Sequence, residues 1–112
     1  MSDDTFISYE PATGEELWRG EATDVNAAVA TARGAWPAWA GQSLTKRIEL
    51  VRQFANQVRK RADEFAELIA RETGKPLWEA RTEVDAVINK VEISVNAYAE
   101  RTGKKKLDSA LQ

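Results

Sequence analysis

Three charged side chains near the middle of this 112-residue chain have a spacing that could support acid–base chemistry. Glu72, Lys75 and Glu79 surround the Gly-Lys-Pro turn at residues 74–76, and a carboxylate close to an amine can exchange protons with a substrate. Charged residues around a turn are more often helix caps and surface charges, and we interpret these three in that way. The sequence contains no Cys and no His, which excludes a thiolate nucleophile, an imidazole base and a Cys/His zinc site within these residues.

A second candidate surface, partly polar, lies on one face of the helix predicted from about Leu77 to Arg101. Apolar residues recur there every seven positions and predict a long apolar seam, made of Leu77, Val84, Val91 and Tyr98 with Ala80, Val87 or Ile88, and Val95 between them. A different face carries Thr82, Ala86, Asn89 and Ile93, with Lys90 beside it. This face could contact a polar ligand, or it could be an ordinary solvated surface.

The segment that precedes this helix must set its direction. Phe65, Leu68 and Ile69 fall on one helical face, so a helix is predicted to end just before the turn. Gly74 suits the left-handed position that closes a helix, and Pro76 suits the first turn of a new one. The sequence therefore predicts two amphipathic helices that meet at a fixed corner.

The first forty residues predict a hairpin and a helix. Two segments on either side of the Pro-Ala-Thr-Gly turn at residues 11–14 indicate a β-hairpin over residues 5–21. Thr23 or Asp24 is expected to cap the helix that follows, and Pro37 is expected to end it. Trp36 and Trp39 could stack on a ligand, but we expect them to plug a core.

Ser43 is the predicted N-cap of the next helix, in which Leu44, Ile48, Val51 and Val58 recur at helical spacing. Residues 62–73 either continue this helix or begin a new one after a kink near Asp63. The fold class expected is therefore mainly α, with an N-terminal hairpin (5–21), four helices (24–103) and a tail (104–112).

The composition argues against several kinds of partner. The net charge is −2, and the basic residues at 47–61 alternate with acidic ones, so we expect no nucleic-acid binding by them or by the lysines at 104–106. No apolar run approaches the length of a membrane span, and the first ten residues are acidic and lack the features of a signal peptide. We expect a cytoplasmic protein without membrane partners. The long seam leaves open a free-standing helical module that binds a partner helix.

An ordered set of short motifs resembles the N-terminal part of NAD(P)-dependent aldehyde dehydrogenases. The motifs are Pro-Ala-Thr-Gly-Glu at 11–15, the Ala-rich helix ending at residues 36–39, Ser-Leu-Thr-Lys-Arg at 43–47 and Glu-Thr-Gly-Lys-Pro at 72–76. Each is weak alone, but their order and spacing fit the family over roughly residues 6–103. The segments at 67–84 and 88–103 resemble one bacterial branch in particular, which acts in arginine catabolism on a substrate with several carboxylates.

The resemblance implies that these residues are an incomplete part of a longer α/β enzyme. In the family a Cys thiolate attacks the aldehyde, hydride passes to NAD or NADP, and a Glu-activated water releases the acid. The family pattern places those residues and the cofactor site after position 112. We therefore expect no catalytic residue, cofactor site or metal site here, and an inactive chain that partners the rest of the enzyme. Its unpaired apolar surface also predicts self-association.

The resemblance further implies that the helix after the Gly-Lys-Pro corner borders the substrate tunnel. Thr82, Ala86, Asn89 and Lys90 are the residues expected nearest to that tunnel. An ammonium at Lys90 would complement a substrate carboxylate. The alternative is that Lys90 is a surface charge and that Thr82 is a packing residue.

Overall fold

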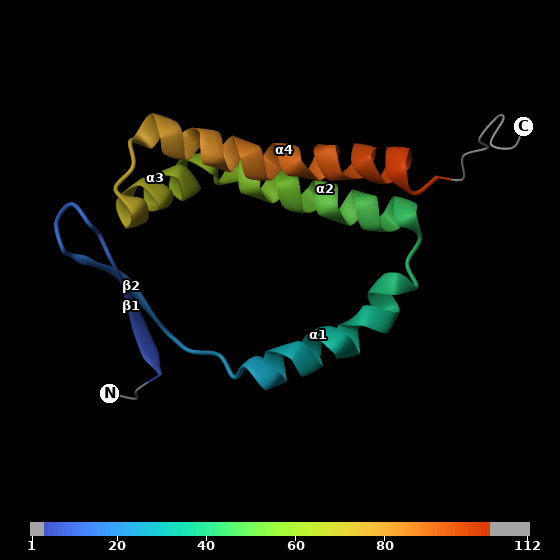
Figure 1. Cartoon of the computed structure of the whole chain (residues 1–112), viewed down its shortest axis with the longest axis horizontal. Coiled ribbons are helices and arrows are strands. Elements are labelled where there is room, and N and C mark those ends of the chain that lie inside the picture. The colour runs from blue at the N-terminus through green and yellow to red at the C-terminus, as the bar shows by residue number, and fades with distance from the viewer. Residues whose placement is uncertain (1–3, 104–112) are drawn as a thin grey trace, which may run out of the picture.

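The computed structural model describes residues 4–103 and confirms a mainly α fold in which a hairpin precedes four helices (Figure 1). The elements are β1 (Thr5–Tyr9), β2 (Glu16–Glu21), α1 (Val25–Ala40), α2 (Leu44–Lys60), α3 (Ala62–Thr73) and α4 (Leu77–Arg101). The expected tail at 104–112, with its three lysines, lies outside the described residues. The assignment of the chain to a part of a larger domain stays a prediction.

The hairpin forms as its turn chemistry predicts. β1 and β2 are antiparallel, with Thr5 opposite Glu21, and the pairing shifts between Ser8 and Tyr9. Gly14 takes a φ of 76°, which is strained for other residues, and its N–H donates to the carbonyl of Glu10 at 2.8 Å. Cross-strand packing of the Phe6 and Trp18 rings, 5.7 Å apart, adds to the backbone pairing.

Helix α1 corrects two of our expectations. It does not end at Pro37, which lies inside its last turn. The ring removes one helical hydrogen bond, but the Pro37 carbonyl still accepts from the N–H of Gly41 at 3.0 Å, and the helix ends at Ala40. The aromatic pair is not a core plug within this chain, since Trp36 is 67% exposed and Trp39 is 42% exposed. No described residue of α1 is buried, because α1 lies apart from the other helices (Figure 1).

Helices α2 and α3 are separate. Ser43 caps α2 as predicted, accepting from the N–H of Lys46 at 3.1 Å. The break falls at Arg61, whose φ of −113° and ψ of 20° leave the helical region. The Arg61 guanidinium then binds Glu64 at 2.7 Å and lies 5.0 Å from the centre of the Phe65 ring. The new direction lets α3 pack against α4.

The core lies where α2, α3 and α4 meet. The buried apolar residues of the described chain are Ala55, Ala66, Ala80, Val84, Ile88 and Val91. The sequence predicted that either Val87 or Ile88 belongs to the seam of α4. Ile88 is buried, and Val87 is 50% exposed. Ala66 and Ala80 have no exposed surface, so small side chains allow α3 and α4 to approach closely.

The molecule is open for its size. Its accessible surface is 9317 Å², whereas a compact protein of this mass exposes about 6,200 Å². Its radius of gyration is 20.2 Å, whereas about 13 Å is typical of a compact chain. In Figure 1, α2, α3 and α4 form one layer, and α1 and the hairpin extend away from it. Much apolar surface is therefore left without cover.

Candidate functional site

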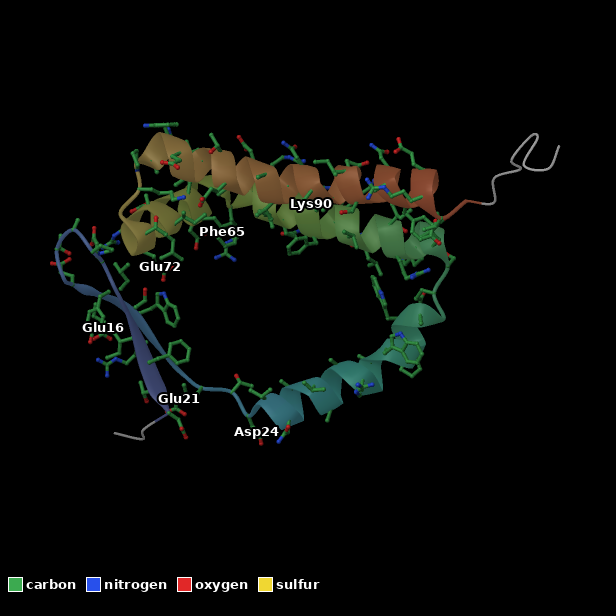
Figure 2. All side chains as sticks on the ribbon, viewed as in Figure 1. Glu16, Glu21, Asp24, Phe65, Glu72 and Lys90 are labelled. Carbon is green, nitrogen blue, oxygen red and sulfur yellow. The ribbon has the colours of Figure 1, made fainter. Side chains whose placement is uncertain are left out.

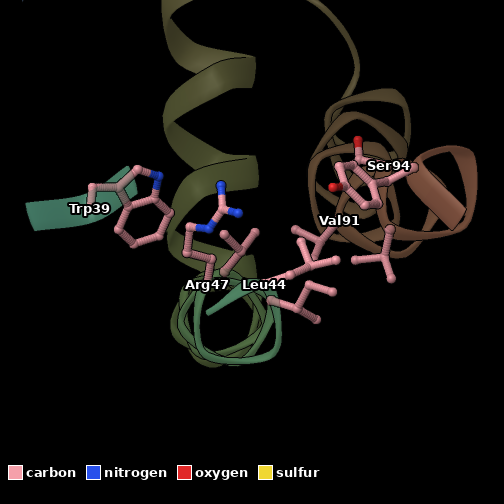
Figure 3. A pocket seen from close by; sticks show the side chains of 9 residues that line it. Trp39, Leu44, Arg47, Val91 and Ser94 are labelled. Carbon is pink, nitrogen blue, oxygen red and sulfur yellow. The ribbon is translucent and has the colours of Figure 1, made fainter. Parts of the chain in front are cut away.

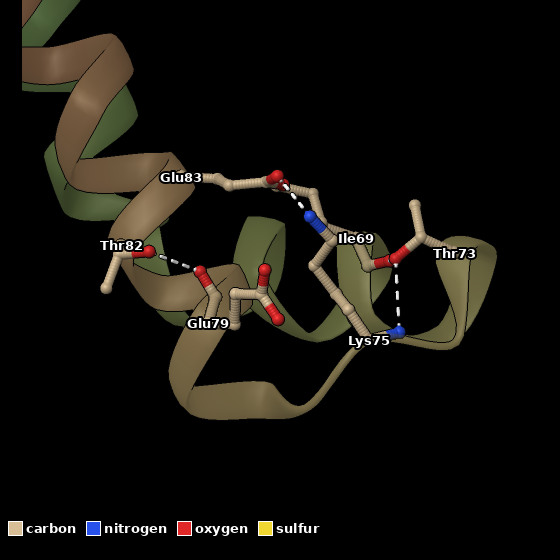
Figure 4. Close-up of polar contacts among 6 residues, drawn as sticks. All are labelled: Ile69, Thr73, Lys75, Glu79, Thr82 and Glu83. Atoms are coloured by element: carbon tan, nitrogen blue, oxygen red, sulfur yellow. Dashed lines mark hydrogen bonds and ion pairs between the residues drawn. The ribbon is translucent and has the colours of Figure 1, made fainter.

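The corner between α3 and α4 has the predicted geometry. Gly74 takes a φ of 77°, and its N–H donates to the carbonyl of Ala70 at 2.9 Å. Pro76, with a φ of −59°, is the N-cap of α4 rather than its first residue. The Thr73 hydroxyl donates to the carbonyl of Ile69 at 2.7 Å, which closes the last turn of α3 (Figure 4). The corner thus sets the direction of the helix that carries the candidate tunnel residues.

The charged side chains at the corner are held in structural contacts. The Lys75 amine binds the Glu83 carboxylate (Figure 4), and this hydrogen bond raises the pKa of Lys75. A protonated amine cannot act as a general base at neutral pH. The backbone carbonyl of Glu79 accepts from the Thr82 hydroxyl at 2.6 Å. The ion pair agrees with our interpretation of Lys75 as a structural residue, whereas Glu79 makes its contact through the backbone.

Glu72 differs from that interpretation, since it is neither a cap nor a free surface charge. One oxygen of its carboxylate accepts from the Ser8 hydroxyl at 2.8 Å and from the indole N–H of Trp18. The neighbouring Arg71 binds Glu10 at 3.3 Å. The two partners of Glu72 lie on the two strands, and Glu72 points toward the hairpin in Figure 2. Glu72 and Arg71 therefore dock the hairpin onto the end of α3.

Acid pH is expected to release the hairpin. The hydrogen bonds from Ser8 and Trp18 lower the pKa of Glu72 from its ordinary value of 4.5. A carboxylate whose pKa is lower in the folded state stabilises it fully above its unfolded pKa, and this stabilisation is lost as the pH falls through the folded pKa. The indole N–H resonance of Trp18 should therefore lose its hydrogen-bonded shift as the pH falls below the ordinary carboxyl pKa of 4.5. Glu72→Gln keeps an acceptor that does not titrate, and an unchanged acid transition in this variant would contradict the assignment.

The four candidate tunnel residues are all exposed on α4. With about 3.6 residues per turn, Thr82, Ala86 and Asn89 lie together on the side opposite the buried Val84. Lys90 lies at the edge of that face, one turn after Ala86, near the middle of α4 (Figure 2). The helix therefore presents the four residues along one exposed strip.

An apolar groove runs along the other flank of α4. It consists of three adjoining pockets along α2, α3 and α4. The middle pocket shares Val51 and Val91 with the pocket at one end, and it shares Phe54 and Val87 with the pocket at the other end. We define the α2–α4 groove by Trp39, Val51, Phe54, Val87, Val91 and Tyr98. Figure 3 shows one end, where Trp39 of α1 and Arg47 of α2 face α4. Lys90 also lines the groove, so it borders both surfaces.

Two kinds of site have no support in the described part of the chain. Residues 4–103 contain no cluster of Asp and Glu side chains that could hold a metal ion. None of the helices described has the length and hydropathy needed to span a membrane.

The fold and the motifs that build it define a class of protein. A family model for the aldehyde dehydrogenase family matches residues 1–111, and the chain belongs to that family. Over all 112 residues it is 67% identical to the N-succinylglutamate 5-semialdehyde dehydrogenase of Novosphingobium aromaticivorans, of which it covers 24%. It is 58% identical over 111 residues, 99% of its length, to the enzyme of the same name from Sphingopyxis alaskensis and covers 23% of that relative.

A third relative, again named N-succinylglutamate 5-semialdehyde dehydrogenase, is from Paraburkholderia xenovorans. It is 51% identical over 104 residues, which are 90% of this chain and 21% of the relative. The chain thus spans about a quarter of the length of the curated relatives it matches. The comparisons confirm the predicted resemblance to the aldehyde dehydrogenase family and to its bacterial N-succinylglutamate 5-semialdehyde dehydrogenase branch.

Three features were not predicted from the sequence. The docking of Ser8 and Trp18 on Glu72 joins residues 64 and 54 positions apart, and no local pattern signals such a pair. The groove was foreseen only as unpaired apolar surface, because periodicity identifies an apolar face but does not show which part stays uncovered. The position of Arg47 in the groove had no sequence signal beyond a basic residue on an amphipathic helix.

Proposed function

We propose that these residues are the N-terminal part of an NAD- or NADP-dependent aldehyde dehydrogenase that oxidises N-succinylglutamate 5-semialdehyde to N-succinylglutamate in arginine catabolism. The observation that carries the proposal is 67% identity to an enzyme of that name over the whole chain. Such an oxidation needs a nucleophile for the aldehyde and a cofactor that accepts hydride. The chain has no Cys and no Gly-rich phosphate loop, so we assign neither role to its residues and expect it to be inactive alone.

In this proposal the chain contributes structure to the enzyme and forms one wall of the substrate tunnel. The corner at Gly74 fixes the direction of α4, and α4 presents Thr82, Ala86, Asn89 and Lys90 along one exposed strip. We propose that this strip lines the tunnel and that the Lys90 amine binds a carboxylate of the succinylated substrate. The long, flexible stem of lysine suits contact with a mobile anion.

A chimera tests the role of Lys90. In it, residues 1–112 replace the matched quarter of the Novosphingobium aromaticivorans enzyme, so that the rest of the chain supplies the chemistry. Lys90→Ala should raise KM for N-succinylglutamate 5-semialdehyde about tenfold, because a hydrogen bond to a charged group contributes about 1.5 kcal/mol. The KM for an uncharged aliphatic aldehyde should not change.

Lys60→Ala is the matched control, since Lys60 is also exposed but lies at the end of α2. It should leave both KM values unaltered. If Lys90→Ala also leaves KM for the succinylated substrate unaltered, Lys90 is a surface charge and its proposed role is wrong.

The rest of the enzyme is the proposed main partner of these residues, and we propose that the chain self-associates when it is isolated. Exposed large apolar side chains support both proposals, among them Trp36, Phe54 and Trp78 at 67%, 56% and 69% exposure. A cytoplasmic location without nucleic-acid partners remains a prediction from composition.

A further inference from the structure

Arg47 lies in the α2–α4 groove without a charged partner. It is half-buried in the pocket that Trp39, Leu44, Val91 and Ser94 also line (Figure 3). Its Nε is buried and makes no hydrogen bond within the described residues. A guanidinium that is partly removed from water among apolar side chains is costly unless a hydrogen-bonded anion compensates it.

Two acidic residues of the groove helices are already paired with other basic residues. Glu49 binds Lys46 at 3.4 Å, and Glu92 binds Arg52 at 2.6 Å. Arg52 is more than half exposed and pairs across α2 and α4 on the surface. The exposed Arg52 therefore has a carboxylate partner, whereas Arg47 in the apolar groove has none among residues 4–103.

The surroundings of Arg47 indicate what its missing partner must be. The planar guanidinium matches a carboxylate through two parallel hydrogen bonds. The remaining groove wall is apolar and would cover an aliphatic or aromatic side chain. An occupant that satisfies both requirements is a polypeptide segment in which one Asp or Glu is flanked by apolar residues.

We propose that this occupant belongs to the remaining three-quarters of the aldehyde dehydrogenase chain, and that an acidic side chain there pairs with Arg47 as the segment packs into the groove. This rests on the proposed function only in that the chain is completed by an aldehyde dehydrogenase, whatever its substrate. The uncovered area supports it: the chain exposes 9317 Å², about 3,000 Å² more than a compact chain of its mass. A standard protein–protein contact covers only about 800 Å² per partner.

Arg47→Met, measured in two settings, tests the proposal. In the isolated chain the Tm should be unchanged or slightly raised, because an unpaired charge is replaced by an apolar side chain of similar length. In the chimera defined above the Tm should fall by about 5 °C, because the same change leaves a buried carboxylate unpaired. Arg47→Lys keeps a charge and should lower the Tm of the chimera less.

Arg52→Met is the matched control. Its partner Glu92 lies within the chain, so Arg52→Met should lower the Tm of the isolated chain as well as that of the chimera. If Arg47→Met lowers the Tm of the isolated chain by several degrees, the partner of Arg47 lies within these residues or in a second copy, and the proposal is wrong. Dependence of that decrease on protein concentration would identify the second copy.

A chemical cross-link provides a second readout. Carbodiimide treatment of the Arg47→Lys chimera joins an amine to a carboxylate that touches it, and mass spectrometry locates the bond. The expected product links position 47 to an Asp or Glu outside the 112 residues, and a link only to acidic residues within them would overturn the proposal. If the chimera shows these results but does not oxidise the succinylated aldehyde, the proposed substrate fails and the groove assignment stands.

Discussion

Replacing Ala80 by leucine is expected to separate α3 from α4 and to lower the Tm of the chain by about 10 °C. Ala80 has no exposed surface and belongs to the same buried cluster as Ala66 and Val84. Three additional carbon atoms at this position would force the two helices apart, and inserting methylenes into a packed core costs about 1–3 kcal/mol. The described core has six buried residues, so little packing remains to offset this loss.

Ala86→Leu makes the same chemical change on the same helix and serves as its control. Ala86 is exposed on the strip opposite Val84, so its larger side chain meets solvent and the Tm should stay within about 1 °C. Thermal unfolding followed by circular dichroism measures both variants. Equal decreases in Tm would show that α4 does not bury the face that contains Ala80.

The second large effect concerns activity. The isolated chain should not oxidise any aldehyde, whereas the chimera should do so at a rate close to that of the parent relative. The reason is chemical: without Cys, the chain has no thiolate to attack the aldehyde carbon and form the covalent intermediate from which hydride is transferred. A chain that is 67% identical should retain the packing that positions the chemistry supplied by the rest of the enzyme.

Local features of the fold were predictable because their causes are local. Gly74 closes α3 and Ser43 caps α2 through contacts within four residues, and both residue types carry a strong preference for these positions. The seam of α4 was predictable from its spacing only in its middle: Val84 and Val91 are buried, whereas Leu77 and Tyr98 at its ends are 43% and 47% exposed. The break between α2 and α3 was one of two alternatives, and the structure places it two residues before Asp63.

Tertiary features were not predictable in the same way. Trp36 and Trp39 are of a residue type that often fills a protein core. Both are exposed here, so any cover for them must come from outside the described helices. Pro37 is tolerated because it lies in the last turn of α1, where only one helical bond is lost. The pairing of Glu72 with the hairpin depends on how α3 meets the strands, which no periodicity shows.

Only part of the candidate site could be predicted from the sequence. The helical face of Thr82, Ala86 and Asn89 follows from spacing alone, and the structure places all three on one exposed strip. Their relation to a substrate tunnel came from the family resemblance and stays a proposal. Lys90 lies beside both the strip and the groove. Its place in the groove could not be predicted, because it depends on the packing of α2 beside α4.

The rate of nicotinamide reduction is the sharpest test of whether these residues belong to an enzyme that oxidises the succinylated aldehyde. Purified chimera and purified 112-residue chain are each mixed with NAD or NADP and N-succinylglutamate 5-semialdehyde, and the absorbance of the reduced cofactor is followed. We expect sustained turnover by the chimera and none by the isolated chain. Turnover by the isolated chain would contradict the proposed function, and so would a folded chimera that oxidises simple aldehydes but not the succinylated one.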